Sequence, residues 1–118
     1  VMHVGWVGRR MPLHATASGK SLLAHAPEHT LAPALARLER LTAATITDPA
    51  ALRRELAEVR RRGYATAWAE LEPDLAAVGA PVRDHRGDVV AAIAIGGPVS
   101  RCSRRQLELL ARPVMEAA

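Results

Sequence analysis

Two apolar segments in the C-terminal half of the chain, 75–82 and 89–97, constrain its fold more than any other feature of the sequence. A polar stretch that contains Gly87 joins them. Two apolar runs separated by a short glycine-containing loop are typical of an antiparallel β-hairpin. The second run is apolar at nearly every position, which predicts a central strand buried on both faces of a sheet.

The clearest helix signal lies in the stretch 48–63. Asp48 is a favoured N-cap, Pro49 suits the first helical position, and Gly63 is a favoured residue just past a helix end. Apolar residues recur between these signals at a spacing that places them on one helix face: Leu52, Leu56 and Val59. An amphipathic helix is therefore predicted here.

Weaker signals complete the order of elements. Short helices are expected after an N-cap at Ser18 and from Pro27 towards Leu38. Ser103 begins a capping-box pattern, which predicts a C-terminal helix. Strand character is found in the segments 1–7 and 64–71. Grouped strands with segregated helices predict an α+β fold, in which helices pack on one antiparallel sheet.

The length of 118 residues fits one domain with a core of its own. No apolar run reaches the roughly 18 residues that a membrane span requires, and no signal peptide is evident, so no membrane partner is expected. The single cysteine, Cys102, cannot form an internal disulfide, which favours a reducing, cytoplasmic setting. Because the chain begins at Val1 without an initiator methionine, we expect a fragment.

The net charge of +4 suggests a nucleic-acid partner, but the placement of the charges argues against one. Arginines and glutamates alternate along the predicted helix, as on a solvated helix face: Arg53, Arg54, Glu55, Glu58, Arg60, Arg61 and Arg62. The chain has no phenylalanine, one tyrosine and two tryptophans, so platforms for base stacking are scarce. Direct contact of this segment with DNA is therefore not predicted.

Two motifs resemble ligand sites without meeting their requirements. Residues 18–21 read Ser-Gly-Lys-Ser, the end of a phosphate-binding P-loop, but the pattern requires a glycine where the chain has His14. His25 and His29 have the spacing of two metal ligands on a helix, yet Pro27 separates them and no third ligand is evident. We therefore predict neither a metal nor a cofactor.

Catalytic patterns are equally weak. Ser, His and Asp all occur, but the G-x-S-x-G nucleophile elbow does not. Cys102 has arginine neighbours that favour its thiolate, without any surrounding motif. Glu70, Glu72 and Asp74 form an acidic cluster near a predicted strand end, without a partner at a diagnostic spacing. The chain is therefore not predicted to be an enzyme, and a small hydrolase remains an alternative.

Three segments in order, 8–27, 41–65 and 80–101, closely resemble the effector domain of the IclR family of bacterial transcription regulators. The resemblance extends over nearly the whole chain. It implies a GAF-like domain that senses metabolites, in a protein whose winged helix-turn-helix domain binds operator DNA. It also implies dimers or tetramers. On this interpretation residues 1–118 are an effector-binding domain truncated at its N-terminal side, and the DNA-binding domain lies outside the sequence.

The same resemblance implies a ligand site formed by a loop, one strand and the hairpin. The corresponding residues are Ala17, Ser18, Gly19, Ala67, Ala77, Ala94 and Gly96. Family members often carry an acidic residue, a cysteine and serines at the last four positions. Each hydrogen bond lost to a charged ligand group removes roughly 1.5–3 kcal/mol. We therefore expect an apolar or aromatic effector that is larger than a small oxo-acid, with Trp68 as an aromatic wall and a carboxylate near Ser18.

Other interpretations stay open at this point. If Trp68 faces outward and the pocket is degenerate, the domain would be an oligomerisation module that binds no ligand. Ser18 would then serve only as a helix cap. The sensor interpretation requires the loop before Ser18 and the hairpin over 80–97 to enclose one mostly apolar cavity.

Overall fold

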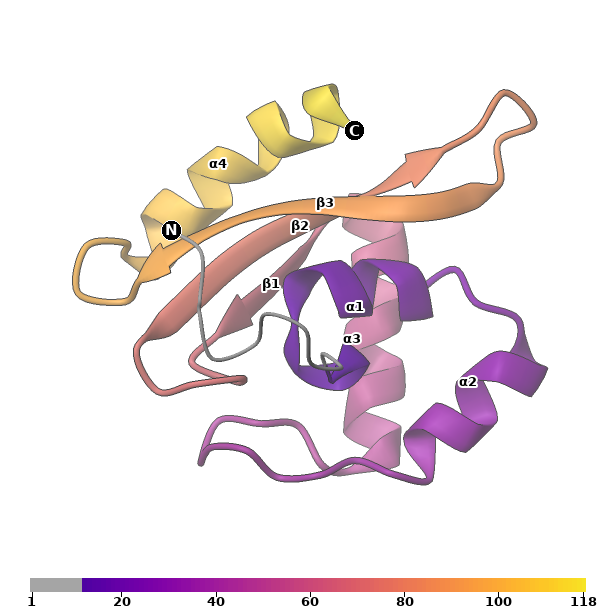
Figure 1. Ribbon diagram of the computed structural model, residues 1–118, viewed down its shortest axis with the longest axis horizontal. Helices are drawn as coiled ribbons and strands as arrows, with labels where there is room; N and C mark the ends of the chain where they lie inside the picture. The colour runs from indigo at the N-terminus through magenta and orange to yellow at the C-terminus, as the bar shows by residue number, and fades with distance from the viewer. Residues whose placement is uncertain (1–11) are drawn as a thin grey trace.

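The computed structural model describes residues 12–118, and these form an α+β fold (Figure 1). A three-stranded antiparallel sheet lies between the C-terminal helix on one side and the other helices on the other, and the prediction of helices packed on an antiparallel sheet is confirmed. The elements in chain order are a 3-10 turn (Leu13–Ala15), α1 (Ala17–Leu23), α2 (Glu28–Leu35), α3 (Pro49–Arg62), β1 (Ala65–Trp68), β2 (Leu75–Arg83), β3 (Val89–Pro98) and α4 (Arg104–Ala117).

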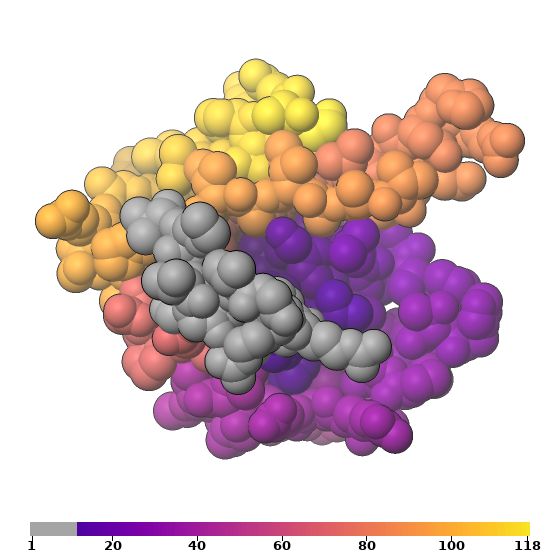
Figure 2. Space-filling view, in the orientation of Figure 1, coloured from indigo at the N-terminus to yellow at the C-terminus, as the bar shows by residue number. Residues whose placement is uncertain are grey.

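The sheet has the order β1-β2-β3, and the predicted hairpin forms its second pair of strands. Its register places Ala77 of β2 opposite both Ala67 of β1 and Gly96 of β3. The Asp84 carboxylate accepts hydrogen bonds from the amides of Arg86 and Asp88, which fixes the turn that projects from the body of the molecule (Figure 2).

The prediction that β3 is a central strand buried on both faces is wrong for the described residues. There β2 is central and β3 is an edge strand, with Val90 60% exposed and Ile95 45% exposed. The apolar residues of a strand indicate that its side chains pack against other apolar groups. Whether the strand is central or at an edge depends on its pairing with distant segments. Within residues 12–118 the outer edge of β3 has no partner strand.

One face of the sheet packs against α4. Ala76, Val78 and Ala80 of β2 contact one helix face that carries the buried residues Leu107, Ala111 and Val114. The predicted capping box is present, because Ser103 Oγ accepts from Gln106 N and Gln106 Oε1 accepts from Ser103 N. This cap fixes where the helix begins and therefore which residues it turns towards the sheet.

The other face of the sheet is covered by α1, with α3 and α2 behind it (Figure 1). Their shared core consists of Leu23, Ala24, Leu31, Leu35, Leu52, Leu56, Val59 and Ala65. The helix α3 begins and ends as predicted: Asp48 Oδ2 accepts from Ala51 N, and Gly63 adopts a left-handed φ of 89°.

Two helix boundaries differ from the sequence expectation. The N-cap of α1 is Thr16 rather than Ser18, because Thr16 Oγ1 accepts from Gly19 N at 3.0 Å. The second helix ends at Leu35 instead of continuing to Leu38. The strand expected over 1–7 lies outside the described residues. No helix among residues 12–118 combines the length and apolar character that crossing a bilayer demands.

Candidate functional site

A cavity of about 140 Å³ lies between the start of α1 and the sheet. Three segments that are far apart in the sequence form its walls: the 3-10 turn with the first residues of α1, the end of β1 with the loop that follows it, and the β2–β3 hairpin. The lining residues are Ala15, Thr16, Ala17, Ser18, Ala67, Leu71, Leu75, Ala77 and Ala94. The loop before Ser18 and the hairpin therefore meet around one cavity.

The structure brings five of the eight expected site residues to the lining of this cavity: Ala17, Ser18, Ala67, Ala77 and Ala94. The other three, Gly19, Trp68 and Gly96, are not among the lining residues, and each has a different structural reason.

Gly19 supports the cavity wall instead of facing the cavity. A Cβ atom at this position would lie 2.2 Å from the carbonyl oxygen of Leu13 and 2.4 Å from its Cα. Such distances are far below van der Waals contact, so only glycine lets α1 approach the 3-10 turn this closely. This approach places Ala15 and Ala17 side by side in the lining.

Trp68 lies on the opposite face of the sheet. Successive residues of a strand point to opposite faces, so Trp68 alternates with the cavity residue Ala67. Its ring packs against the core under α4, and the Arg104 guanidinium lies 4.9 Å from the ring centroid. Trp68 is therefore not a wall of this cavity.

Gly96 is a neighbour of the lining through its strand partner Ala77. A Cβ atom there would meet Ala76 O at 2.8 Å and Ala77 Cβ at 3.2 Å. A serine side chain at this position would therefore displace β2 in the present backbone.

Sequence reasoning missed Leu71 and Leu75, which supply the largest apolar side chains of the lining. Both lie at the ends of the short polar segment 72–74, which connects β1 to β2. Two leucines that flank a polar turn are a signal for a loop folded back onto apolar surface. That signal was available in the sequence.

The polar groups of the lining are few. Thr16 Oγ1 already accepts from Gly19 N and donates to Pro12 O at 3.2 Å, so its hydroxyl is engaged in the structure of the loop. Ser18 is the other polar residue of the lining. The remaining lining side chains are alanines and leucines, so the cavity favours an apolar group with one polar end.

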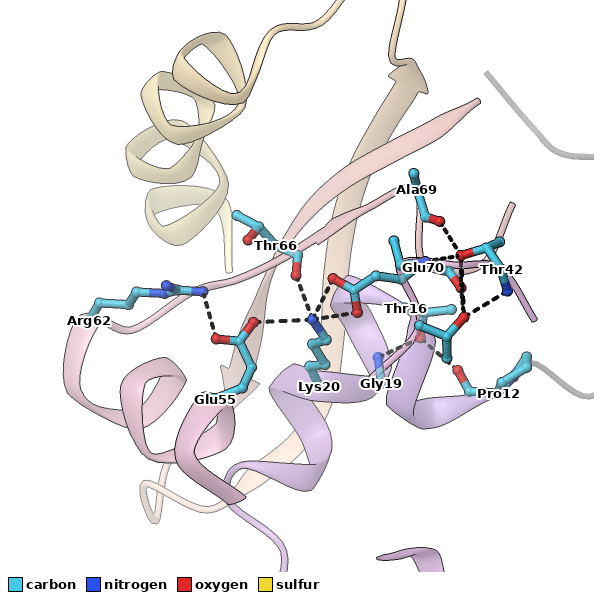
Figure 3. A network of polar contacts seen from close by, with 12 residues as sticks. Pro12, Thr16, Gly19, Lys20, Thr42, Glu55, Arg62, Thr66, Ala69 and Glu70 are labelled. Atoms are coloured by element: carbon cyan, nitrogen blue, oxygen red, sulfur yellow. Dashed lines mark hydrogen bonds and ion pairs between the residues drawn. The ribbon is translucent and has the colours of Figure 1, made fainter. Parts of the chain in front are cut away.

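Beside the cavity lies a buried ionic network centred on Lys20 (Figure 3). The Lys20 side chain is 0% exposed. Its Nζ lies 2.7 Å from Glu70 Oε1, 2.9 Å from Thr66 O and 3.1 Å from Glu55 Oε2. The lysine of the P-loop-like segment is thus enclosed by protein acceptors rather than presented to a phosphate.

Glu70, the acidic residue of this network, has a pKa raised above its ordinary value. Burial raises the pKa because it penalises the carboxylate, and the ammonium of Lys20 opposes this effect by favouring the carboxylate. Among residues 12–118 no cluster of three or more His, Cys, Asp or Glu side chains is arranged to hold a metal ion.

Comparison with known proteins identifies the family of this chain. Residues 1–118 match the model of the family described as bacterial transcriptional regulator IclR, C-terminal. The regulator BhcR of Paracoccus denitrificans is 43% identical over 113 residues, which cover 94% of this chain and 40% of BhcR. The chain therefore spans less than half the length of this relative.

Two solved structures with the same fold contain aromatic acids. An IclR homologue of Microbacterium hydrocarbonoxydans in complex with 4-hydroxybenzoate is 35% identical, with a TM-score of 0.82; the match covers 98% of this chain and 48% of that one. The inducer-binding domain of a PobR double mutant from Acinetobacter, in complex with 3-hydroxybenzoic acid, is 29% identical, with a TM-score of 0.84 and coverage of 93% and 64%. The chain belongs to the IclR family of bacterial transcriptional regulators and corresponds to the family's C-terminal domain.

Proposed function

We propose that this domain is the sensor of a transcription regulator and that it binds an aromatic acid with a single ring. Binding would change how a winged helix-turn-helix domain outside the given sequence holds its operator DNA. The observation that carries this proposal is the cavity of about 140 Å³, which is formed jointly by α1, the β1–β2 loop and the hairpin. A cavity of roughly 150 Å³ with apolar walls accepts benzene.

The size of the cavity favours a ligand with one ring among the apolar ligands expected from the sequence. Burying about 150 Å² of ring surface contributes about 4 kcal/mol. A carboxylate or hydroxyl directed towards Ser18 would add a polar contact on the α1 wall. The hydroxybenzoates found with the Microbacterium and Acinetobacter relatives have this combination of one ring and polar ends, which supports the proposed ligand class.

Calorimetric titration of the 118-residue chain with 3-hydroxybenzoate, 4-hydroxybenzoate and pyruvate tests this proposal. We expect an aromatic acid to bind more tightly than pyruvate, and saturation at 100 times the dissociation constant to add about 2.7 kcal/mol to the free energy of unfolding. Tighter binding of pyruvate, or no binding of either aromatic acid, would contradict the proposed ligand class.

A cavity-filling variant locates the binding site. Ala94 is an exposed residue of the cavity lining, and Ala94→Leu adds three carbon atoms to that lining, so we expect the affinity for the aromatic acid to fall at least tenfold. Ala91→Leu is the matched control, because Ala91 is an exposed residue of the same strand and is not part of the lining. Its affinity should stay within twofold of the original. An equal loss of affinity in both variants would show that the ligand binds outside this cavity.

An assembly role is the second candidate, and the exposed apolar edge of β3 favours it. In this case copies of the domain form the dimer or tetramer of a cytoplasmic regulator, and the cavity has no ligand. Calorimetric titration would then detect no binding of either aromatic acid, although copies of the domain would still associate. No catalytic role is proposed.

A further inference from the structure

We propose that Lys20 is a positioning residue for the cavity: its ammonium group ties the α1 wall to the β1 wall and so sets the distance between them. This inference rests on the proposed sensor function, because the cavity is the same. It assigns a ligand-related role to a side chain that does not itself line the cavity.

The first step concerns the α1 wall. Thr16, Ala17 and Ser18 line the cavity, and Lys20 lies in the first turn of the same helix. Because residues on a helix move together as a rigid unit, a restraint on Lys20 also restrains the wall that precedes it. The complete burial of Lys20 makes that restraint strong, since a buried ammonium must keep its partners.

The second step concerns the opposite wall. The two partners of Lys20 in this region, Thr66 O and the Glu70 carboxylate, belong to residues directly before Ala67 and Leu71 in the sequence. Ala67 and Leu71 are both lining residues. Lys20 therefore holds the β1 wall at two points, each one residue from a side chain that faces the cavity (Figure 3).

The third step concerns the backbone between those two points. Ala69 has a φ of 59°, in the left-handed region that alanine rarely adopts. Thr42 Oγ1 donates to Ala69 O at 2.6 Å, and Thr45 Oγ1 donates to Glu70 O at 2.6 Å. An unfavourable backbone conformation persists only where several contacts impose it. Removing the carboxylate anchor of Glu70 should therefore let this wall move.

The fourth step separates positioning from stability. Glu55 of α3 also contacts Lys20, at 3.1 Å, and its other carboxylate oxygen lies 4.0 Å from Arg62. Neither Glu55 nor its chain neighbours line the cavity. Glu55→Gln and Glu70→Gln thus remove the same charge from the same lysine, but only Glu70→Gln weakens a contact to the cavity wall.

The experiment compares these two variants in the 118-residue chain. Affinities for 3-hydroxybenzoate and 4-hydroxybenzoate are measured by calorimetry, and thermal unfolding is measured beside them. We expect Glu70→Gln to lower the affinity for the better ligand at least tenfold and to change the ratio between the two isomers at least threefold. Glu55→Gln should leave the affinity within twofold and the ratio unchanged. Equal effects of the two variants, or none from Glu70→Gln, would overturn the proposal.

A measurement without ligand distinguishes failure of this inference from failure of the sensor proposal. Methyl NMR reports the surroundings of Ala67, Leu71 and Leu75 directly. Glu70→Gln should shift the methyl signals of these three residues, and Glu55→Gln should leave them in place. If the original chain binds neither acid but the shifts occur as expected, the sensor proposal fails and the positioning role of Lys20 stands. If the methyl signals of Glu70→Gln are unchanged, the positioning role is refuted.

Discussion

Lys20 and Glu70 are ionisable residues that the fold buries against each other. The ammonium is fully enclosed and the carboxyl nearly so, and they lie within 2.9 Å of each other. Burial disfavours the charged form of each group, and their mutual attraction offsets part of that cost. The raised pKa of Glu70 shows that burial outweighs the attraction for the carboxyl.

A pH dependence of stability follows from this balance. Because its pKa is higher in the folded state, Glu70 binds more protons folded than unfolded, so its contribution to stability falls as pH rises. The contribution should be fully present below the ordinary pKa of 4.5 and should disappear as pH rises through the raised value. Urea unfolding at several pH values checks this, with Glu70→Gln as the reference. A free energy of unfolding that rises with pH in the original chain relative to Glu70→Gln would contradict the assigned direction.

Among the elements, those whose signals are local could be predicted from the sequence. The helix α3 follows from Asp48, Pro49 and Gly63, because caps act through the nearest backbone groups. The hairpin follows from the alternation of apolar runs and a turn. The edge position of β3 could not be predicted, because strand order depends on pairing between distant segments.

The same distinction applies to the candidate site. Ala17, Ser18, Ala67, Ala77 and Ala94 were named because their neighbourhoods resemble those of a known family, and they do meet in one cavity. The pairing of Lys20 with Glu70, 50 residues apart, has no local signature. The left-handed conformation of Ala69 has none either, since it is imposed by contacts from the segment 42–45.

The contact between α1 and the 3-10 turn gives a prediction at the scale of elements. Gly19→Ala introduces a Cβ within 2.6 Å of the Leu13 backbone, so the two elements must separate. We expect a loss of about 1–3 kcal/mol in the free energy of unfolding, as for other overpacked sites. Gly97→Ala is the control, because its Cβ would meet nothing within 4 Å. Denaturant titration of both variants measures the contrast, and a loss no larger for Gly19→Ala than for the control would speak against the close approach.

At the scale of the whole molecule, the two faces of the sheet are covered by helices, whereas the outer edge of β3 is open within the described residues. No charged residue occurs in β3 from Val89 to Pro98. Proteins usually protect such edges with charged residues, prolines or bulges, and the proline of β3, Pro98, is the last residue of the strand. Among residues 12–118 this edge has no partner strand, and β3 carries the exposed side chains of Val90 and Ile95.

We expect the 118-residue chain to associate through this edge as its concentration rises. Ile95→Lys places a charge on β3 and should shift the protein towards the monomer, as measured by sedimentation velocity. Leu109→Lys is the matched control: Leu109 is 67% exposed, but it lies on α4 and not on the strand. Loss of association in the control alone would assign the contact to the helix, and a monomer at all concentrations would show that the edge does not pair.

The alanines around the cavity have a consequence for how its ligand range could change. The lining residues include the alanines Ala17, Ala67, Ala77 and Ala94. Nearly every substitution of an alanine adds atoms, so single mutations at these positions exclude larger ligands. Extra room is available mainly by shortening Leu71 or Leu75. A preference for smaller ligands can therefore be reached by any of several single substitutions, whereas adaptation to a second ring has to begin at one of the two leucines.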